Sequence, residues 1–241
     1  MKKVIIIAEA GVNHNGSIQK AKKLILAASK AKADYVKFQF YKTDNIVTKS
    51  NKLANYQKKN LEKNISQYDL LKKYELSILD ILRLKKYAKI KKIKFLTSVF
   101  DLESFNKLIK NNIKEIKIPS GEINNIDLIE KISKSAKKVF ISSGMANFSE
   151  ISTAIKILKK NKKLNKNIYL MHCNTDYPTK LNDVNLKIMP ILKKKYKVNI
   201  GYSDHTITNH VAIAAVALNA RVIEKHFTLS RRLKALTTKQ V

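Results

Sequence analysis

The stretch VFISSGMANFSEISTAIKILKKNKKLNKNIYLMHC, residues 139–173, contains one complete unit of the fold that we expect. It opens with the apolar, β-branched run Val139–Ser142, continues with the amphipathic segment Ser149–Asn161, and ends with a second apolar run, Ile168–His172. Short continuous apolar runs are typical of parallel strands buried on both faces, whereas the segment between them has helical periodicity. The stretch therefore predicts a strand–helix–strand unit with parallel strands.

The same alternation extends in both directions along the chain. The expected strands are Val4–Glu9, Tyr35–Phe40, Lys94–Ser98, Glu115–Pro119, Val139–Ser142, Ile168–His172, Val198–Gly201 and Arg221–Glu224. The clearest helices are Ser17–Ala31, Ile78–Ile90, Leu102–Asn111, Ile126–Ser135, Ser149–Asn161, Val184–Lys194 and Asn209–Leu218. Eight such units favour a closed barrel over an open doubly wound sheet, and a barrel typically needs about 250 residues. We therefore predict the α/β class, with residues 1–241 forming a single (β/α)8 TIM barrel domain.

Three further details complete the expected fold. Good helix caps are the residues Ser17, Asp101, Ser149 and Asp183. The long segment 42–75 lacks clear periodicity, so we interpret it as a loop over the mouth of the barrel. After the eighth strand only residues 225–241 remain, and Ser230–Val241 is short and basic, so we expect the last helix to be incomplete.

The composition restricts the classes of partner. The formal net charge is +31, but only 4 of the 49 basic residues are arginine and the lysines are spread along the whole chain. We interpret most of them as solvated helix faces and expect no nucleic-acid partner, because base and phosphate recognition favours the forked guanidinium of arginine. Such a charge would still attract small anions at long range.

The cysteine count and the hydropathy indicate a compartment. The single cysteine, Cys173, cannot form an intrachain disulfide, which fits a reducing environment. No stretch approaches the ~20 apolar residues of a membrane span, and the N-terminal apolar run is ended early by Glu9. We therefore expect a cytoplasmic protein without a membrane partner.

Polar residues follow the expected strands, at the end of a barrel where active sites form. Residues two apart in a strand share a face, so we expect Lys37 with Gln39, and Glu224 with His226, to point inward. His205 and His226 come from neighbouring strands and could bind a divalent metal, with Glu9 or water completing the ligands. The alternative is that each histidine caps its strand by bonding a backbone carbonyl.

Hydroxyl side chains and one lysine form a second candidate site. The hydroxyls at strand ends are those of Thr97, Ser98, Ser120, Ser142, Ser143 and Ser203. Together with Lys37 and backbone N–H groups beside glycine they could hold an anion, although small hydroxyl residues are also common at strand ends without a function. Lys37 could instead form a Schiff base, as in barrel aldolases. Adjacent residues of a strand point to opposite faces. We therefore expect His172 to point inward and Cys173 to lie in the outer layer of the barrel.

Seven ordered motifs between residues 4 and 229 resemble the family of N-acetylneuraminate (sialic acid) synthases and N,N'-diacetyllegionaminate synthases. They are Ile7-Ala8-Glu9-Ala10-Gly11-Val12-Asn13-His14-Asn15-Gly16, Lys37-Phe38-Gln39, Lys117-Ile118-Pro119-Ser120-Gly121-Glu122, Ser142-Ser143-Gly144-Met145, His172-Cys173-Asn174-Thr175-Asp176-Tyr177-Pro178, Gly201-Tyr202-Ser203-Asp204-His205-Thr206 and Glu224-Lys225-His226-Phe227-Thr228-Leu229. The resemblance implies a transferase of carbohydrate biosynthesis that condenses phosphoenolpyruvate with N-acetylmannosamine, or a related diacetylated amino sugar, to give a nonulosonic acid and phosphate.

The resemblance also implies roles for individual residues. His205 and His226 would bind Mn2+ or Mg2+, which would polarise the sugar aldehyde. The phosphate and carboxylate of phosphoenolpyruvate would be held by Lys37, Thr97, Ser120, Ser142 and Ser203, and Asn174 would also bind substrate. The residues Glu9, Glu122 and Tyr177 would lie at the sugar and the reacting carbons. C3 of phosphoenolpyruvate would attack the aldehyde, water would add at C2, and phosphate would leave by C–O cleavage.

The chain departs from the family pattern at its C-terminal end. The family continues from the eighth strand into a Gly-Pro-Asp-His-type segment with an active-site Asp, whereas here Leu229 is followed by Ser230-Arg231-Arg232-Leu233. Full-length members are homodimers in which a C-terminal antifreeze-like domain supplies an Arg to the partner's sugar site, and this chain has no room for that domain. We interpret this departure as a frameshift or a truncated reading frame, which leaves the activity and the dimerisation of the chain open. Other phosphoenolpyruvate-dependent or aldolase-type barrels, and a non-catalytic basic binding protein or fragment, are the alternatives.

Overall fold

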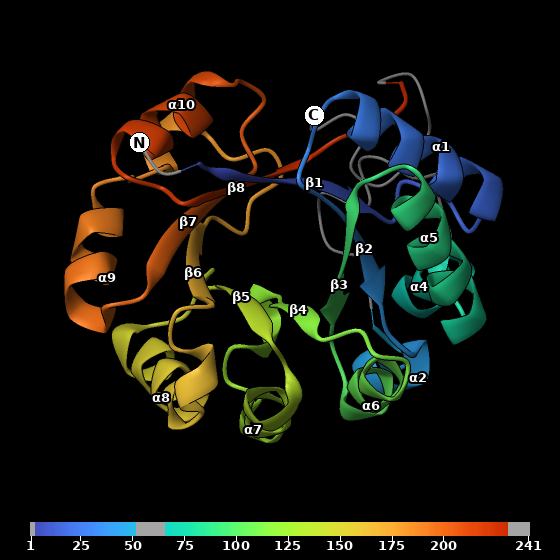
Figure 1. The fold of residues 1–241 in the computed structure, drawn as a ribbon, viewed down its shortest axis with the longest axis horizontal. Helices are drawn as coiled ribbons and strands as arrows, with labels where there is room; N and C mark the ends of the chain where they lie inside the picture. Colours follow the sequence, from blue (N-terminus) through green and yellow to red (C-terminus); the bar gives the residue numbers. More distant parts are fainter. Residues whose placement is uncertain (1–2, 52–65, 231–241) are drawn as a thin grey trace.

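A computed structural model describes residues 3–51 and 66–230 of the chain. Eight parallel strands close into a barrel in the order of the sequence, and the helices surround it (Figure 1). The strands are β1 (Ile5–Gly11), β2 (Tyr35–Phe40), β3 (Lys94–Val99), β4 (Glu115–Ile118), β5 (Lys138–Ser142), β6 (Ile168–Cys173), β7 (Asn199–Asp204) and β8 (Val222–His226). The predicted (β/α)8 barrel and all eight predicted strands are confirmed.

The helices alternate with the strands as expected. They are α1 (Ile18–Lys30), α2 (Thr43–Ile46), α4 (Gln67–Tyr74), α5 (Ile78–Ile90), α6 (Leu102–Lys110), α7 (Ile126–Ser135), α8 (Phe148–Lys160), α9 (Ile188–Tyr196) and α10 (His210–Ala217). Short 3-10 turns are η1 (Ser120–Glu122), η2 (Lys162–Leu164) and η3 (Leu181–Asp183). In the described part of the chain, no helix combines the length and the apolar composition that a membrane crossing requires.

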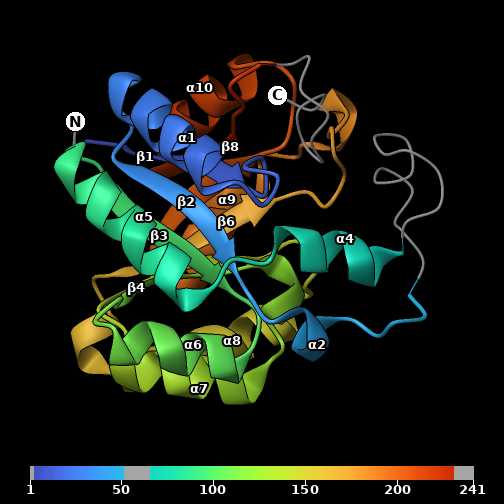
Figure 2. The same cartoon turned by 90° about the vertical axis from the view of Figure 1, so that its right-hand side faces the viewer.

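The insertion after β2 contains regular structure at both ends. We predicted a loop over residues 42–75, but α2 and α4 occupy its two described parts and lie beyond the end of β2 (Figure 2). The side chains of Ser66 and Asp69 stabilise the start of α4, since the Ser66 hydroxyl accepts from the Asp69 N–H at 3.0 Å. Two predicted segments lie outside the described residues. They are residues 52–65 of the loop and the part of the incomplete last helix that follows Ser230.

Two of the four predicted helix caps are confirmed. Ser17 and Asp101 each accept a hydrogen bond from a backbone N–H in the first turn of α1 and α6. Ser149 is not a cap, because Asn147 and Glu150 form a reciprocal capping box that starts α8 two residues earlier. Asp183 is not a cap either, since it lies in η3 and α9 begins only at Ile188.

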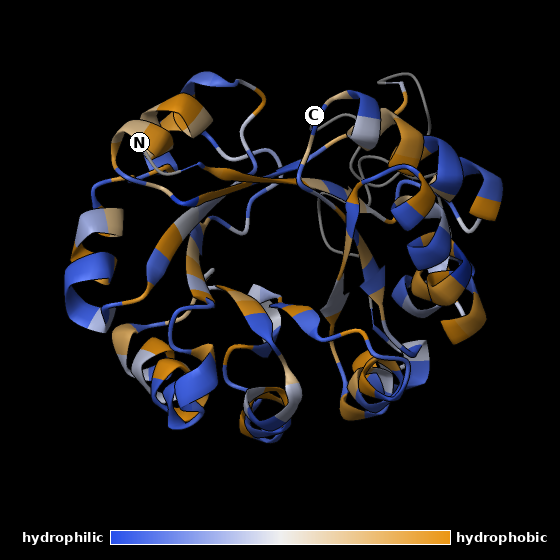
Figure 3. Cartoon of the chain, viewed as in Figure 1, coloured by the Kyte–Doolittle hydropathy of each residue, from blue (hydrophilic) through white to orange (hydrophobic). Residues whose placement is uncertain are grey.

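The hydrophobic core has two layers on opposite sides of the strands. The outer layer packs the strands against the apolar faces of the helices, and α10 (His-Val-Ala-Ile-Ala-Ala-Val-Ala) is mostly hydrophobic (Figure 3). The inner layer fills the barrel with buried side chains from six strands: Ile7, Tyr35, Leu96, Phe140, Met171 and Val222. Gly201 belongs to the same level, because a Cβ there would lie 3.0 Å from Val222 Cβ. The barrel is therefore packed and has no open pore through this layer.

Two residues further along each strand the barrel interior becomes polar. Side chains alternate between the faces of a strand, so the residue two positions after each inner apolar one also points inward. The next inward level consists of Glu9, Lys37, Ser98, Lys117, Ser142, Cys173, Ser203 and Glu224. Buried ionisable groups on an apolar floor are therefore concentrated at the carboxyl ends of the strands, where barrel enzymes place their active sites.

One predicted strand face was wrong, and one predicted substrate-binding residue lies on the outer face. Thr97 pairs with Phe38 and Ile116 of the outer layer, whereas the next residue, Ser98, accepts a hydrogen bond inside the barrel. Cys173 points inward, and His172 points outward, where its ring lies 5.7 Å from that of Tyr202. Both errors have one physical cause: the period of two fixes which residues share a face but not which face is the inner one.

Candidate active site

Four ionisable side chains form a chain of contacts across the barrel. Lys37 Nζ lies 3.4 Å from Glu9 Oε2 and 3.2 Å from Glu224 Oε2. Lys117 Nζ donates to Glu224 Oε1 at 3.1 Å. All four are almost fully buried, so Glu224 is the carboxylate shared by two buried cations.

Hydroxyl groups complete this network. Lys37 Nζ donates to Ser98 Oγ at 3.0 Å, and Ser203 Oγ donates to Glu224 Oε1 at 2.9 Å. The hydroxyl oxygen of Ser142 is buried and has no hydrogen-bond partner in the described structure. Burying a polar group without a partner is costly. Beside the Cys173 thiol, the Ser142 hydroxyl keeps hydrogen-bonding capacity for a bound molecule.

The electrostatics of the four groups differ sharply. Burial works against the charge on Glu224, yet Lys117 and Lys37 hold its pKa well below the ordinary value. Burial also opposes the charge on Lys37, but Glu224 and Glu9 hold its pKa above the ordinary value. By contrast, burial raises the pKa of Glu9 to about 7 and lowers that of Lys117. Glu9 is thus the carboxyl of the site that can exchange a proton near neutral pH.

The two predicted metal-binding histidines lie next to this network. The ring centroids of His205 and His226 are 5.8 Å apart, and Tyr177 stacks on His205 with centroids 4.1 Å apart. Burial lowers the pKa of His205 to about 4, and burial with the neighbouring His205 and Lys37 lowers that of His226 to about 3. Both imidazoles are therefore neutral at physiological pH, the form that ligates metals.

The hydrogen bonds of His205 select the tautomer that suits a metal. Its Nδ1 lies 2.6 Å from the carbonyl oxygen of Asn174, which can only accept, so Nδ1 carries the proton. Its Nε2, 3.3 Å from Ser203 Oγ, keeps its lone pair because the Ser203 proton is donated to Glu224. On His226, Nδ1 is buried without a hydrogen-bond partner among the described residues. Both nitrogens can act as ligands of a divalent cation, His226 Nδ1 when the ring proton is on its Nε2.

The protein offers this cation few further ligands. In residues 3–51 and 66–230, no group of three or more His, Cys, Asp or Glu side chains could hold a metal ion together. Glu9 is nevertheless near, since a Cβ added at Gly11 would lie 3.4 Å from Glu9 Oε1 and 3.7 Å from His226 Nδ1. A bound cation would therefore take most of its oxygen ligands from water or substrate, as open catalytic sites do.

The remaining predicted residues lie at the rim. Asn174 donates from Nδ2 to the carbonyl of Asp183 at 2.7 Å and keeps Oδ1 buried without a hydrogen-bond partner in the described structure. Glu122 accepts from Asn125 Nδ2 at 2.8 Å, and burial raises its pKa. Among the described residues, Glu122 makes this contact with Asn125 and none with the charged network.

A close backbone approach fixes Ser120 at the mouth. Gly144 has φ +47°, and a Cβ built on it would lie 2.2 Å from Ser120 Cβ and 2.7 Å from Ser120 Oγ. Only glycine fits there. The loops after β4 and β5 are therefore in close contact, with Ser120 at the start of η1 and Ser142 at the end of β5.

Two residues of the site received no individual role from the sequence. Ser98 was named only among the strand-end hydroxyls, and Lys117 only as part of a motif, yet each contacts the charged network directly. The alternation of faces would have found Lys117, because Glu115, Lys117 and Pro119 share one face and β4 otherwise consists of isoleucines. For Ser98 the sequence offered two adjacent hydroxyl residues and no signal to choose between them.

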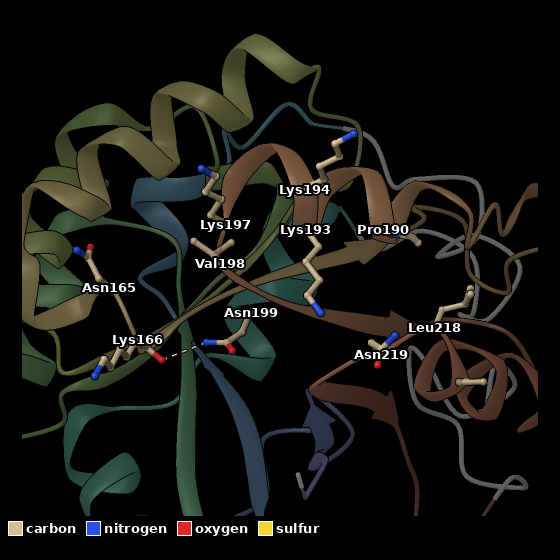
Figure 4. A pocket seen from close by; sticks show the side chains of 11 residues that line it. Asn165, Lys166, Pro190, Lys193, Lys194, Lys197, Val198, Asn199, Leu218 and Asn219 are labelled. Carbon is tan, nitrogen blue, oxygen red and sulfur yellow. Dashed lines mark hydrogen bonds between the residues drawn. The ribbon is translucent and has the colours of Figure 1, made fainter. Parts of the chain in front are cut away.

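A cavity of about 1050 Å³ lies at the opposite end of the barrel. It is lined by the ends of α9 and α10 and the start of β7, and its charged side chains are lysines, including Lys166, Lys193, Lys194 and Lys197 (Figure 4). Lysines at helix C-termini complement the helix dipole and need no ligand to explain them. None of the candidate site residues lines this cavity, so the cavity is not part of the candidate active site.

Comparison with known proteins identifies the family. Residues 24–239 match the NeuB family. The chain belongs to the NeuB family. It is 48% identical over 233 residues to the N,N'-diacetyllegionaminic acid synthase of Campylobacter jejuni, and 42% identical over 230 residues to that of Legionella pneumophila. These alignments cover 97% and 95% of this chain but 70% and 65% of the relatives.

Solved structures support the same assignment. A sialic acid synthetase of Leptospira borgpetersenii in complex with citrate superposes with a TM-score of 0.87 at 36% identity, covering 99% of this chain and 78% of that one. The spore coat polysaccharide biosynthesis protein SpsE of Bacillus subtilis gives a TM-score of 0.79 at 33% identity, covering 98% and 64%. This NeuB family chain therefore corresponds to about two thirds of the length of several relatives.

Proposed function

We propose that this chain condenses phosphoenolpyruvate with an N-acetylated amino sugar, releasing phosphate and a nonulosonic acid. The observation that carries the proposal is the pairing of two buried lysines and three inward serines with two neutral histidines at one end of the barrel. Of the relatives named above, the most similar are diacetyllegionaminic acid synthases, so we propose a diacetylated amino sugar as the acceptor.

The cationic groups suit phosphoenolpyruvate, which carries a phosphate and a carboxylate. Lys37 and Lys117 would bind these anions, and the hydroxyls of Ser98 and Ser142 would donate to their oxygens. The Ser203 hydroxyl, which donates to Glu224, would hold that carboxylate in place beside the anion. In the free protein Glu224 holds both ammonium groups within 3.2 Å. The site is therefore charged and ordered before the anion arrives, which lowers the cost of binding.

The histidines would hold a divalent cation, which we propose to be Mn2+ or Mg2+. When bound, it would polarise the sugar aldehyde toward attack by C3 of phosphoenolpyruvate. Tyr177, stacked on His205, would bound the sugar on one side. Glu9, with a pKa near 7 through burial, would hold or give a proton beside the reacting carbons.

The Schiff-base alternative is less consistent with the geometry. A Schiff-base lysine must lose its proton before it attacks a carbonyl. The carboxylates Glu224 and Glu9 hold the pKa of Lys37 above its ordinary value, so Lys37 remains charged. This charge suits an anion-binding role and opposes the aldolase mechanism considered from the sequence.

The test is product formation by the purified chain with phosphoenolpyruvate, Mn2+ and each candidate amino sugar, using mass spectrometry and phosphate release. We expect phosphate release that requires a diacetylated sugar and disappears in His205→Ala. A product formed only with other aldehydes would support a different phosphoenolpyruvate-dependent enzyme. Salt-sensitive binding of polyanions that ignores His205→Ala, with no turnover, would support the basic binding protein instead. A cytoplasmic location, which we also propose, is tested by cell fractionation.

A further inference from the structure

Lys225 lies on β8 between two residues of the site, Glu224 and His226. Because side chains alternate along a strand, Lys225 leaves the barrel on the outer face while its neighbours point inward. Its Nζ donates to Asp204 Oδ2 at 2.7 Å, to the carbonyl of Thr206 at 2.7 Å and to the carbonyl of Thr208 at 3.0 Å. An ammonium group has three N–H donors, so the hydrogen-bonding capacity of Lys225 is fully used.

Asp204 binds the same loop from its other oxygen. Asp204 Oδ1 accepts from the N–H of Thr206 at 2.9 Å and from its hydroxyl at 2.7 Å. The hydroxyl also lies 3.1 Å from the carbonyl of Thr208. The side chain of Asp204 is fully buried, and Lys225 is the cation that neutralises it. Lys225, Asp204, Thr206 and Thr208 therefore form one closed network, which we call the outer clamp.

The outer clamp fixes the backbone on both sides of His205. The histidine lies between Asp204 and Thr206 in the chain, and its own side chain turns inward to Ser203 and Asn174. His226 follows Lys225 directly on the strand that carries the clamp. One charged side chain thus joins the backbone segments that present the two imidazoles, whose centroids lie 5.8 Å apart.

We propose that Lys225, acting through Asp204, is a positioning residue that sets the geometry of the His205–His226 pair for cation binding. The inference rests on the proposed function only for the role of the two histidines. Groups that orient metal ligands without touching the metal typically change affinity by about 10- to 100-fold when they are removed. Lys225 would orient the loop backbone instead of the ring, with the same consequence for the nitrogen positions.

The experiment measures Mn2+ affinity of the whole chain by electron paramagnetic resonance, without substrates, in Lys225→Met and a matched control. The control is Lys138→Met, since Lys138 is similarly buried, with a side chain 17% exposed against 23% for Lys225. It donates to Tyr35 Oη at 3.0 Å at the other end of the barrel. We expect Lys225→Met to weaken Mn2+ binding about 10-fold or more and Lys138→Met to leave it unchanged.

A second variant guards against misfolding. Lys225→Met leaves Asp204 buried without its cation, whereas the double variant Lys225→Met/Asp204→Asn removes both charges. We expect the double variant to keep its thermal midpoint closer to that of the original chain and still to bind Mn2+ weakly. In the metal-free protein, hydrogen exchange of the Thr206 amide should accelerate in both variants, while the strands β2 to β5 keep their protection.

The outcomes separate this inference from the proposed function. If His205→Ala and His226→Ala abolish Mn2+ binding but both Lys225 variants bind as tightly as the original chain, the positioning role is refuted and the metal site stands. If neither histidine variant affects Mn2+ binding, the proposed metal site is wrong, and the positioning role fails with it. Equal weakening by Lys138→Met would also refute the inference, because any partly buried lysine would then have the same effect.

Discussion

Replacing Glu224 by glutamine tests whether the buried charges stabilise one another. The carboxylate contacts Lys37 at 3.2 Å and Lys117 at 3.1 Å and accepts from Ser203 at 2.9 Å. Among the residues described, it is the only carboxylate within 4 Å of Lys117, whereas Lys37 also contacts Glu9. Glu224→Gln keeps the shape of the side chain and leaves Lys117 buried without a counter-charge.

The expected loss of stability is large. Breaking a buried ion pair by removing one partner typically costs about 3–5 kcal/mol. With a urea m-value of about 2–3 kcal/mol/M, this loss would move the unfolding midpoint down by about 1–2.5 M. The matched control is Glu115→Gln, whose Lys138 contact is longer, 3.8 Å, and whose carboxylate is 35% exposed. Exposed pairs typically contribute less than about 1 kcal/mol, so the control should shift little.

The pH dependence gives the prediction a second readout. Burial by itself raises the pKa of Glu224, but Lys117 and Lys37 lower it. In the folded protein this pKa lies below its ordinary value of 4.5. An acid whose pKa falls on folding stabilises the folded state above the unfolded pKa and loses that contribution as the pH falls toward the folded pKa. The stability difference between the original chain and Glu224→Gln should therefore be complete at pH 7 and shrink below about pH 4.5.

Urea unfolding at several pH values measures both effects. A loss below about 1 kcal/mol at pH 7, or a difference that does not shrink in acid, would refute the reasoning, because the lysines would then not depend on this carboxylate. The double variant Lys117→Met/Glu224→Gln should recover stability relative to Glu224→Gln, since it no longer leaves the Lys117 ammonium buried alone. Further destabilisation in the double variant would contradict the same account.

Two further predictions concern the mouth of the barrel. Ser98→Ala should weaken phosphoenolpyruvate binding about 10-fold or more in titration calorimetry, because a hydrogen bond to a charged group contributes about 1.5–3 kcal/mol. Thr97→Val, on the outer face, should change the affinity little. Equal effects of the two variants would show that the strand face does not matter for binding. Gly144→Ala should destabilise the protein by roughly 1–3 kcal/mol in urea unfolding, because the added Cβ meets Ser120 at 2.2 Å in a backbone with φ +47°. Gly121→Ala is its control, as no atom lies within 4 Å of an added Cβ there, and similar losses in the two variants would count against the close-approach argument.

The sequence predicted the barrel well because its signal is local and repeated. Each strand is a short apolar run between helical segments, so every unit could be recognised separately. The strand ends were less accurate: β7 continues to Asp204, three residues beyond the predicted end at Gly201. Polar residues such as Ser203 resemble a loop in the sequence, but inside a barrel they are the functional part of the strand.

The site was predicted in part, and the reason lies in its geometry. Lys37, Ser203, Glu224 and the two histidines converge because parallel strands bring their carboxyl ends to one edge. The face of Thr97 could not be deduced from adjacent hydroxyl residues. The outer clamp of Lys225 was equally hidden, since it depends on a loop conformation that no periodicity specifies.

A phosphoenolpyruvate site in the polar layer of the barrel is tested most directly by titration calorimetry. The affinity for phosphoenolpyruvate is measured at fixed ionic strength for the original chain, Lys117→Met and Lys138→Met. The two lysines carry the same charge at opposite ends of the barrel, so long-range attraction affects both variants alike. The account predicts that Lys117→Met weakens binding about 10-fold or more, as expected for a charged hydrogen bond, and that Lys138→Met binds like the original chain. Equal affinities in all three, or equal losses in both variants, would contradict a phosphoenolpyruvate site in the polar layer of the barrel.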